Sequence, residues 1–496
     1  MSLTKKLYKG AGSLALGKMG GKFFAILRLV ILARLLTTED MGIITLLMMT
    51  VALLEMLSQL GADKLLIQAK DGDDPIFQGC VHVTRILRGC FNAVVLLAIA
   101  VPTARFFGAP ETWFAFALLA VVPLIRGLVH TDALRAQRGM KYGPIVRVDL
   151  ASSALAALSA APLALVFGDY RAGLGCIIIK ALTYTVSTHV VATRPYRYAW
   201  DRAIAGRLFR FGWPMLINSA LLYAITHGDK LIIGRYYSTT ELGIYGLAIG
   251  LAMTARMTVA GAMNSLFLPV LARSQDEPDR FASRVRALAT MLSVIGAGIA
   301  VPMVLAGGPL MALIYGAEYA AAGAFIGWLA VMQSVRLVRT APSIAAQARA
   351  DSRMLMYANM VRISSLVPMV LAALNGAPLV VLAQWGCAGE IGAIMTMLLL
   401  HRRHYGLRLA CVGMPLLTAS AVATGCVMVS RPVMPVASDM ISIVAACAVA
   451  AVAVGITAAL VPEARTMIRT FLNDAGGAAR RVRTGPDRGS VTESAS

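Results

Sequence analysis

Charged residues are scarce in this chain of 496 residues: they make up 14% of it, whereas a soluble protein carries roughly 25%. Acidic residues are the scarcer kind, because 25 Asp and Glu stand against 46 Lys and Arg and leave a net charge of +21. A mean hydropathy of +0.72 indicates a polytopic membrane protein. The basic residues lie in short clusters between apolar runs rather than on one basic face, so we expect no nucleic-acid partner.

Sequence motifs for catalysis and metal binding are also missing. The seven cysteines lie in or beside apolar runs, they form no C-x-x-C pair, and no His/Cys cluster has zinc-site spacing. The sequence holds no P-loop, no G-x-S-x-G and no H-E-x-x-H motif. We therefore expect neither an enzyme, nor a metal site, nor a cofactor, and we interpret the cysteines as small apolar core residues.

Long apolar runs are what the sequence has in abundance. At about 20 residues for each membrane span, they predict an all-α polytopic membrane protein with about fourteen transmembrane helices. The approximate limits of these helices are 13–35, 41–62, 81–104, 112–131, 146–167, 172–192, 211–234, 242–267, 286–307, 322–341, 354–373, 377–400, 410–430 and 440–461.

The placement of Lys and Arg predicts the orientation of these helices. With the N-terminus in the cytoplasm, the cytoplasmic segments hold 34 of the 46 basic residues, the external connections hold five, and seven lie inside the spans. The alternation does not break along the chain, so we expect both termini on the cytoplasmic side. The first apolar run carries three basic residues, which indicates a retained helix rather than a signal peptide.

A repeat divides the chain into two related parts. Residues 33–43 match residues 234–244 at an offset of 201, with Gly42 opposite Gly243, and further matches follow at offsets of 200 and 210. The repeat predicts two six-helix lobes related by a pseudo-twofold axis along the membrane normal, with a cavity between them. The expected units are a lobe at 1–192, a cytoplasmic inter-lobe loop at 193–210, a lobe at 211–400, two additional helices at 401–462 and a disordered cytoplasmic tail at 463–496.

Basic residues inside the spans are candidates for a binding site. Each costs about 2.5–3.5 kcal/mol at a helix centre, so each should face a cavity or a partner. Cations from both lobes would suit an anionic ligand, for which phosphate or diphosphate is the natural match. For Lys18 the alternative is a side chain that reaches back to the membrane surface. The candidates are Lys18, Lys22, Arg28, Lys180, Arg256 and Arg362.

Polar residues with acceptor oxygens inside the spans are fewer, and they are candidates for coupling transport to a cation or proton. Asn218 and Asp229 are eleven residues apart and share a helix face. The alternative is an internal ion pair, for instance Glu55 with a lysine of the first span. The candidates are Glu55, Asn218, Asp229 and Glu390.

Four segments resemble a known family. Arg34 to Gly42, which precedes an apolar run, and Leu57 to Gln68 are similar to the opening of bacterial polysaccharide exporters of the Wzx type. Ala133 to Tyr142 resembles their basic cytoplasmic loop after the fourth span, and Asp229 to Arg235 resembles the end of their seventh span.

The resemblance places the chain in the multidrug/oligosaccharidyl-lipid/polysaccharide exporter superfamily. It implies a flippase in the bacterial inner membrane that moves undecaprenyl-diphosphate-linked oligosaccharide by alternating access, for exopolysaccharide, capsule or O-antigen. Expected partners are the lipid-linked oligosaccharide, membrane lipid, and polysaccharide polymerase and chain-length regulator proteins. By likeness to the lipid II flippase of the superfamily, Lys22 or Arg28, together with Arg256, would lie in a cationic cavity. Many family members have twelve spans, so the resemblance gives no role to 410–461.

Two other functions are open to the sequence. A cation-coupled multidrug antiporter of the same superfamily is the nearer alternative, but the excess of cations over acids inside the spans disfavours it. A membrane glycosyltransferase or polymerase would need external loops that carry acids or arginines, and the predicted external loops are only a few residues long.

Overall fold

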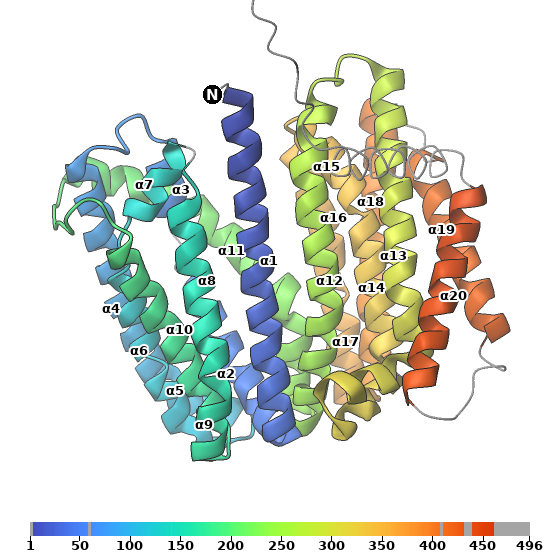
Figure 1. The fold of residues 1–496 in the computed structure, drawn as a ribbon, viewed down its shortest axis with the longest axis horizontal. Helices are drawn as coiled ribbons and strands as arrows, with labels where there is room; N and C mark the ends of the chain where they lie inside the picture. Colours follow the sequence, from blue (N-terminus) through green and yellow to red (C-terminus); the bar gives the residue numbers. More distant parts are fainter. Residues whose placement is uncertain (1–2, 58–60, 140, 407–409, 431–438, 461–496) are drawn as a thin grey trace, which may run out of the picture.

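The computed structural model describes residues 3–57, 61–139, 141–406, 410–430 and 439–460, and every regular element within them is a helix. Figure 1 shows two groups of long helices side by side, which approach each other at one end and diverge toward the end where the N-terminus lies. We call the helices from α1 to α10 the first half and those from α11 to α18 the second half. The predicted tail at 463–496 lies outside the described residues.

The first half follows the predicted spans closely. Its elements are α1 (Leu3–Leu35), α2 (Thr38–Leu57), α3 (Ala62–Gln68), α4 (Pro75–Phe106), the short 3-10 helix η1 (Pro110–Thr112), α5 (Trp113–Leu118), α6 (Val121–Gly127), α7 (Asp132–Arg138), α8 (Gly143–Leu158), α9 (Ala160–Phe167) and α10 (Arg171–Val190).

The second half has the same order of long and broken helices, and two more helices follow it. The elements are α11 (Arg202–Tyr236), α12 (Thr239–Ala272), α13 (Pro278–Tyr315), the 3-10 helix η2 (Ala317–Ala324), α14 (Ile326–Val338), α15 (Thr340–Ala348), α16 (Ser352–Ser364), α17 (Leu366–Leu374), α18 (Leu379–Tyr405), α19 (Ala410–Ser430) and α20 (Asp439–Leu460). Both α19 and α20 pack on α13.

The chain is a multi-pass membrane protein. Among the described residues, ten helices are long and apolar enough to cross a membrane, or eleven if the bent pair of η2 with residues 326–348 is one span. The other three predicted spans correspond to α1, α2 and α11, in which ionisable residues interrupt the apolar sequence. Each of the fourteen predicted ranges thus overlaps a helix, while fourteen membrane crossings remain a prediction.

Prolines explain why several predicted spans appear as two helices. α6, α9, α15 and α17 each begin two residues before a proline: Pro123, Pro162, Pro342 and Pro368. Proline has no N–H to bond the carbonyl four residues earlier, and its ring clashes with that carbonyl, so the helix breaks just before it. In α13 the backbone departs from helical geometry at Ala306, three residues before Pro309.

Both copies of the repeated hairpin begin their second helix with the same cap. At α12, Ser238 and Glu241 form a capping box in which each side chain accepts a hydrogen bond from the other residue's backbone N–H. At α2, Thr37 and Asp40 exchange the equivalent pair of bonds. These bonds satisfy backbone donors that the first turn of a helix leaves free. The repeat therefore encodes where α2 and α12 start.

The two hairpins pack against each other through their glycines. A Cβ on Gly42 would lie 1.9 Å from the carbonyl oxygen of Thr239, and a Cβ on Gly243 would lie 2.2 Å from that of Thr38. Only glycine allows α2 and α12 to approach so closely. The contact is reciprocal, as a twofold relation between the halves predicts. We call it the glycine seam.

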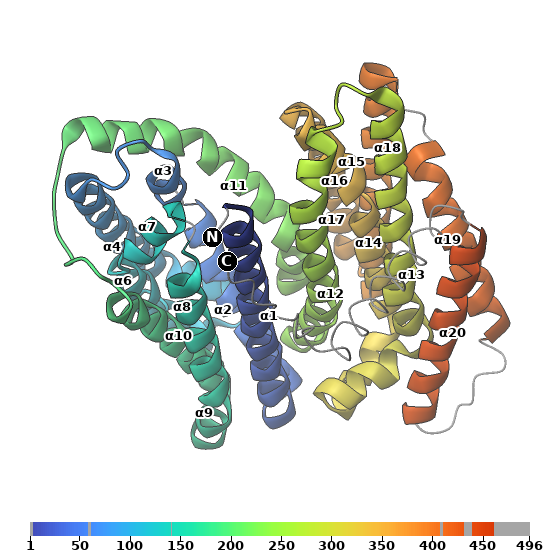
Figure 2. The same cartoon turned by 45° about the horizontal axis from the view of Figure 1, so that its top comes forward.

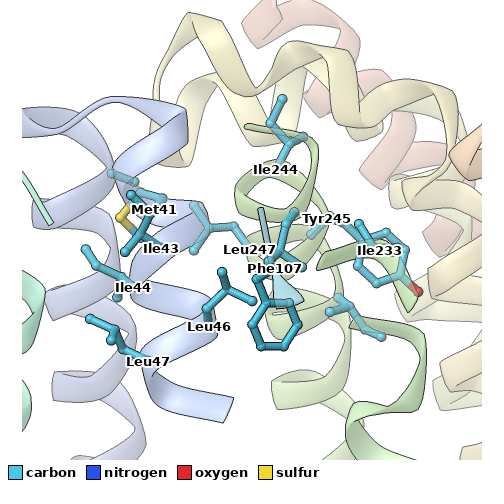
Figure 3. Close-up of a cluster of buried hydrophobic side chains, with 14 of the residues drawn as sticks. Met41, Ile43, Ile44, Leu46, Leu47, Phe107, Ile233, Ile244, Tyr245 and Leu247 are labelled. Carbon is cyan, nitrogen blue, oxygen red and sulfur yellow. The ribbon is translucent and has the colours of Figure 1, made fainter. Parts of the chain in front are cut away.

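Apolar side chains extend the glycine seam into the core. Figure 3 shows Leu46 and Leu47 of α2 in one buried cluster with Phe107, with Ile233 of α11 and with Tyr245 of α12. These side chains are almost fully buried. The largest cluster of the described core therefore joins the two halves at the end where they approach each other.

The connection between the halves differs from the predicted loop at 193–210. Helix α11 begins at Arg202, within that range, and continues without a break to Tyr236. Its first turn is capped by Asp201, whose carboxylate accepts a bond from the Ile204 N–H. Figure 2 shows this helix passing from the first half to the second. The sequence predicted a loop followed by a separate membrane span, whereas the structure joins the end of that loop and the span in one helix.

Candidate functional site

The cations predicted in α1 lie against α12 of the other half. Lys22 Nζ donates a hydrogen bond to Thr258 Oγ1 at 3.2 Å. Lys22 is also near enough to Lys18 and Arg256 for their charges to repel it. Three of the predicted cations, from two different halves, therefore lie close together.

Arg256 leads from this contact to a cluster inside the second half. Its Nε donates to Gln333 Oε1 at 2.7 Å. Its charge also interacts with those of Glu390, Arg362 and Arg339. The half-buried Arg256 is thus positioned between the boundary of the halves and the interior of the second half.

Glu390 of α18 is fully buried at 0% exposure and lies among arginines. Arg336 Nε is 3.4 Å and Arg339 Nε is 3.2 Å from its carboxylate, and Arg362 of α16 forms a third ion pair. We call these four residues together with Arg256 the second-half arginine cluster. Four cations face one carboxylate there, so the cluster keeps a net positive charge.

Arg28 and Lys180 lie on the first-half side. Arg28 is 7% exposed, and its Nε is buried with no hydrogen-bond partner in the described part of the chain. Lys180 of α10 interacts electrostatically with Arg28, Arg126 and Asp149. It also lines a cavity that the sequence did not reveal.

This cavity, which we call the first-half chamber, has a volume of about 330 Å³ and lies among α2, α3, α4, α6, α8 and α10. Two ion pairs border it: Asp63 with Arg85, and Glu55 with Arg126. Burial alone would raise the pKa of Asp63, but the charge and hydrogen bond of Arg85 lower it overall. Its lining is Glu55, Asp63, Arg85, Arg88, Gly89, Asn92, Pro123, Arg126, Val129, Asp149, Ser153, Lys180 and Tyr184.

The candidate coupling residues do not form one site. Glu55 pairs with Arg126 of α6 rather than with a lysine of the first span. Asp229 accepts hydrogen bonds from the Tyr245 hydroxyl at 2.9 Å and from the Lys230 N–H at 2.8 Å. Glu390 belongs to the second-half arginine cluster. The side chain of Asn218 lies outside the described residues.

Several ionisable residues of both sites were missed or misplaced by sequence reasoning. The placement of basic residues predicts that the arginines at the cytoplasmic ends of the spans 81–104, 112–131 and 322–341 face the cytoplasm. The structure instead places them at the two sites: Arg85, Arg88, Arg126, Arg336 and Arg339. Spacing held a usable signal, since residues 85, 88 and 92 recur at i, i+3 and i+7 on one face of α4.

The two halves carry ionisable residues at equivalent positions, with some signs exchanged. Glu55 of α2 corresponds to Arg256 of α12 at the offset of 201 residues seen in the hairpin repeat. At the offset of 210, Arg126 corresponds to Arg336, and Lys180 to Glu390. Each half therefore pairs an arginine of its fourth predicted span with a glutamate, but the glutamate comes from α2 in the first half and from α18 in the second.

A family model described as polysaccharide biosynthesis protein matches residues 31–323. The chain belongs to this family. Curated relatives of this polysaccharide biosynthesis protein include the succinoglycan biosynthesis transport protein ExoT of Rhizobium meliloti (strain 1021), 22% identical over 67% of each chain. Another is the teichuronic acid biosynthesis protein TuaB of Bacillus subtilis (strain 168), 20% identical over 68% of this chain and 70% of its own. The resemblance found in the sequence is confirmed.

Solved structures share the fold of this family member. A lipid II flippase MurJ in an inward closed conformation superimposes with a TM-score of 0.73 and 12% identity, over 90% of this chain and 97% of its own. An inward-facing multidrug resistance MATE family transporter gives 0.63 and 12%, over 78% and 95%. The family and its curated relatives concern polysaccharide, which makes the multidrug antiporter the less favoured alternative.

Proposed function

We propose that this chain is a flippase for lipid-diphosphate-linked oligosaccharide in the bacterial inner membrane, with both termini in the cytoplasm. One observation carries the proposal. The Lys22–Thr258 contact brings the cations of α1 beside Arg256 of the other half. Lys22 and Arg256 come from opposite halves and repel each other unless an anion lies between them, and a diphosphate offers several acceptor oxygens. Lys18, Lys22, Arg28 and Arg256 would hold that group.

The arrangement of the halves supports alternating access. They meet at the glycine seam and diverge toward the end where the N-terminus lies, which we assign to the cytoplasm (Figure 1). In this state the headgroup would enter from the inner leaflet. Opening of the glycine seam would then expose it to the outer side, as two six-helix lobes rock around a fixed site.

Asp229 is the acid we propose for coupling to a cation or proton. Glu55 and Glu390 already have arginine partners, whereas Asp229 has no ion pair within the described ranges. Replacement by Asn should make export insensitive to the ion gradient while headgroup binding persists. Gradient-dependent export by the Asp229→Asn variant would contradict this assignment.

Charge reversal tests the flippase proposal directly. We expect Arg28→Glu and Arg256→Glu to abolish polysaccharide export and to leave lipid-linked repeat units on the inner leaflet, while the protein still inserts. Arg105→Glu, an exposed position on α4, is the matched control and should export normally. Wild-type export by both reversal variants would refute a cationic binding site. Drug sensitivity with normal polysaccharide would instead favour the antiporter.

A further inference from the structure

The first-half chamber contains three charged residues that its two ion pairs leave over. These residues are Arg88, Asp149 and Lys180. Neither Arg88 nor Lys180 makes a hydrogen bond or an ion pair with any residue that the structure describes. Asp149 and Lys180 attract each other, and Lys18 adds to the field at Asp149. Asp149 therefore compensates Lys180, and Arg88 is left without a counter-charge of its own.

The surroundings of Arg88 accentuate this imbalance. Arg85 and Arg126 both repel it, while Asp63 and Glu55, which attract it, are already bound to those two arginines. An uncompensated guanidinium that is partly buried is costly, so a ligand that brings one negative charge would be stabilised there. The lining as a whole has four cations and three carboxylates, a balance that also fits a single negative charge.

The remainder of the lining suits hydroxyl groups. Asn92, Ser153 and Tyr184 supply neutral donors and acceptors, and the Asp149 carboxylate can accept further bonds. At about 330 Å³ the cavity is at the lower end of small-molecule sites, which span roughly 300–1,000 Å³. A single sugar ring fits this description better than a complete repeat unit.

Other ligand classes match the chamber less well. A metal or organic cation would meet four positive side chains. A diphosphate would bring several negative charges toward three carboxylates, and the cations that we propose for it lie elsewhere, around Lys22 and Arg256. The chemistry that remains is a monoanion rich in hydroxyls.

We propose that the first-half chamber is a subsite for an acidic sugar, a monosaccharide unit with one carboxylate that Arg88 binds while the polar lining binds its hydroxyls. The proposal rests on the flippase function and deepens it, because it specifies the saccharide of the substrate. The diphosphate would lie between the halves while an acidic sugar of the same molecule occupies the first half. Export would then favour oligosaccharides that contain an acidic sugar near the lipid.

The test compares two ligands that differ in one group. Full-length protein in lipid nanodiscs is titrated with methyl glucuronide and with methyl glucoside, and separately with pyrophosphate. We expect at least tenfold tighter binding of the glucuronide. Arg88→Gln should lose about ten- to a hundredfold of that affinity, in line with a hydrogen bond between charged groups. Arg88→Lys should retain part of it, and Arg105→Gln, with its charge at the exposed far end of α4, should retain all of it.

Equal affinity of the wild-type protein for the two sugars would overturn the proposal, and this result does not depend on any variant folding. A glucuronide preference that survives in Arg88→Gln would also overturn it. Pyrophosphate reports on the other site: its binding should be unchanged in Arg88→Gln and lost in Arg256→Glu. Failure of pyrophosphate binding in the wild-type protein would count against the flippase proposal, while the two sugars report on the chamber alone.

Discussion

Adding one methyl group at the glycine seam should shift the balance between the states of the transporter. In Gly42→Ala the new Cβ would lie 1.9 Å from a backbone oxygen of Thr239, which belongs to the first turn of α12 and has little freedom to move. Overpacking of this kind costs about 1–3 kcal/mol. The clash exists only while the seam is closed, so the population ratio should shift about 5- to 150-fold toward a state with the seam open.

Distances between the diverging ends of the halves would report this shift. Nitroxide labels at Lys64 and Arg353, both exposed and in predicted cytoplasmic segments, should move closer together in Gly42→Ala and in Gly243→Ala. The exposed Cys90 and Cys447 must be replaced first. Gly250→Ala on the same α12 is the control, because its Cβ would meet nothing within 4 Å. The reasoning is refuted if the Gly42 and Gly250 variants give the same distance distribution as the wild-type protein.

Two further predictions concern stability. Replacement of Glu390 by Leu leaves Arg336, Arg339 and Arg362 without their shared carboxylate, so thermal unfolding in detergent should show a loss of about 3–5 kcal/mol; a variant as stable as the wild-type protein would contradict this. Burial tends to raise the pKa of Asp132, but hydrogen bonds from Arg135 and Thr193 outweigh it and lower the pKa to about 2. A lowered carboxyl pKa stabilises the fold above the unfolded value near 3.8 and stops doing so only as pH falls toward 2. Asp132→Asn should therefore cost about 1–2 kcal/mol at pH 5 and at pH 8, and the cost should shrink as the pH falls from about 4 toward 2. A cost that stays constant down to pH 2 would show that the pKa is not lowered.

The sequence predicted the helices and the repeat well because both depend on local patterns. Apolar length gave the positions of the spans, and the matching residues at 37–40 and 238–241 form matching caps in the structure. The partners of buried charges were harder to predict. Arg126 lies near the cytoplasmic end of the predicted span 112–131, and its glutamate partner lies 71 residues away on another helix. Ion pairs between distant helices depend on how the helices pack, and helix packing cannot be deduced from a single sequence.

The roles of the site residues remain proposals, although their neighbours are now known. Lys18, Lys22 and Arg256 lie close together, while Arg362 forms an ion pair with Glu390 in the second half. The sequence predicted one cavity for all of these cations. It indicates how far along a helix a residue lies, but it does not indicate whether the side chain points between the lobes or into one of them.

Helix α11 limits how the two halves can move. Its 35 residues follow a curved path of about 50 Å along the helix axis (Figure 2). Near its start, Arg207 holds Asp71 of the first half through two hydrogen bonds, and near its end Ile233 is buried in the core between the halves. A change in the angle between the halves must therefore bend α11 or break its contacts at one end. The stiffness of α11 should thus limit how far the angle can change. A few glycines inserted at its centre should broaden the range of angles that spin labels detect, and an unchanged range would show that the limit lies elsewhere.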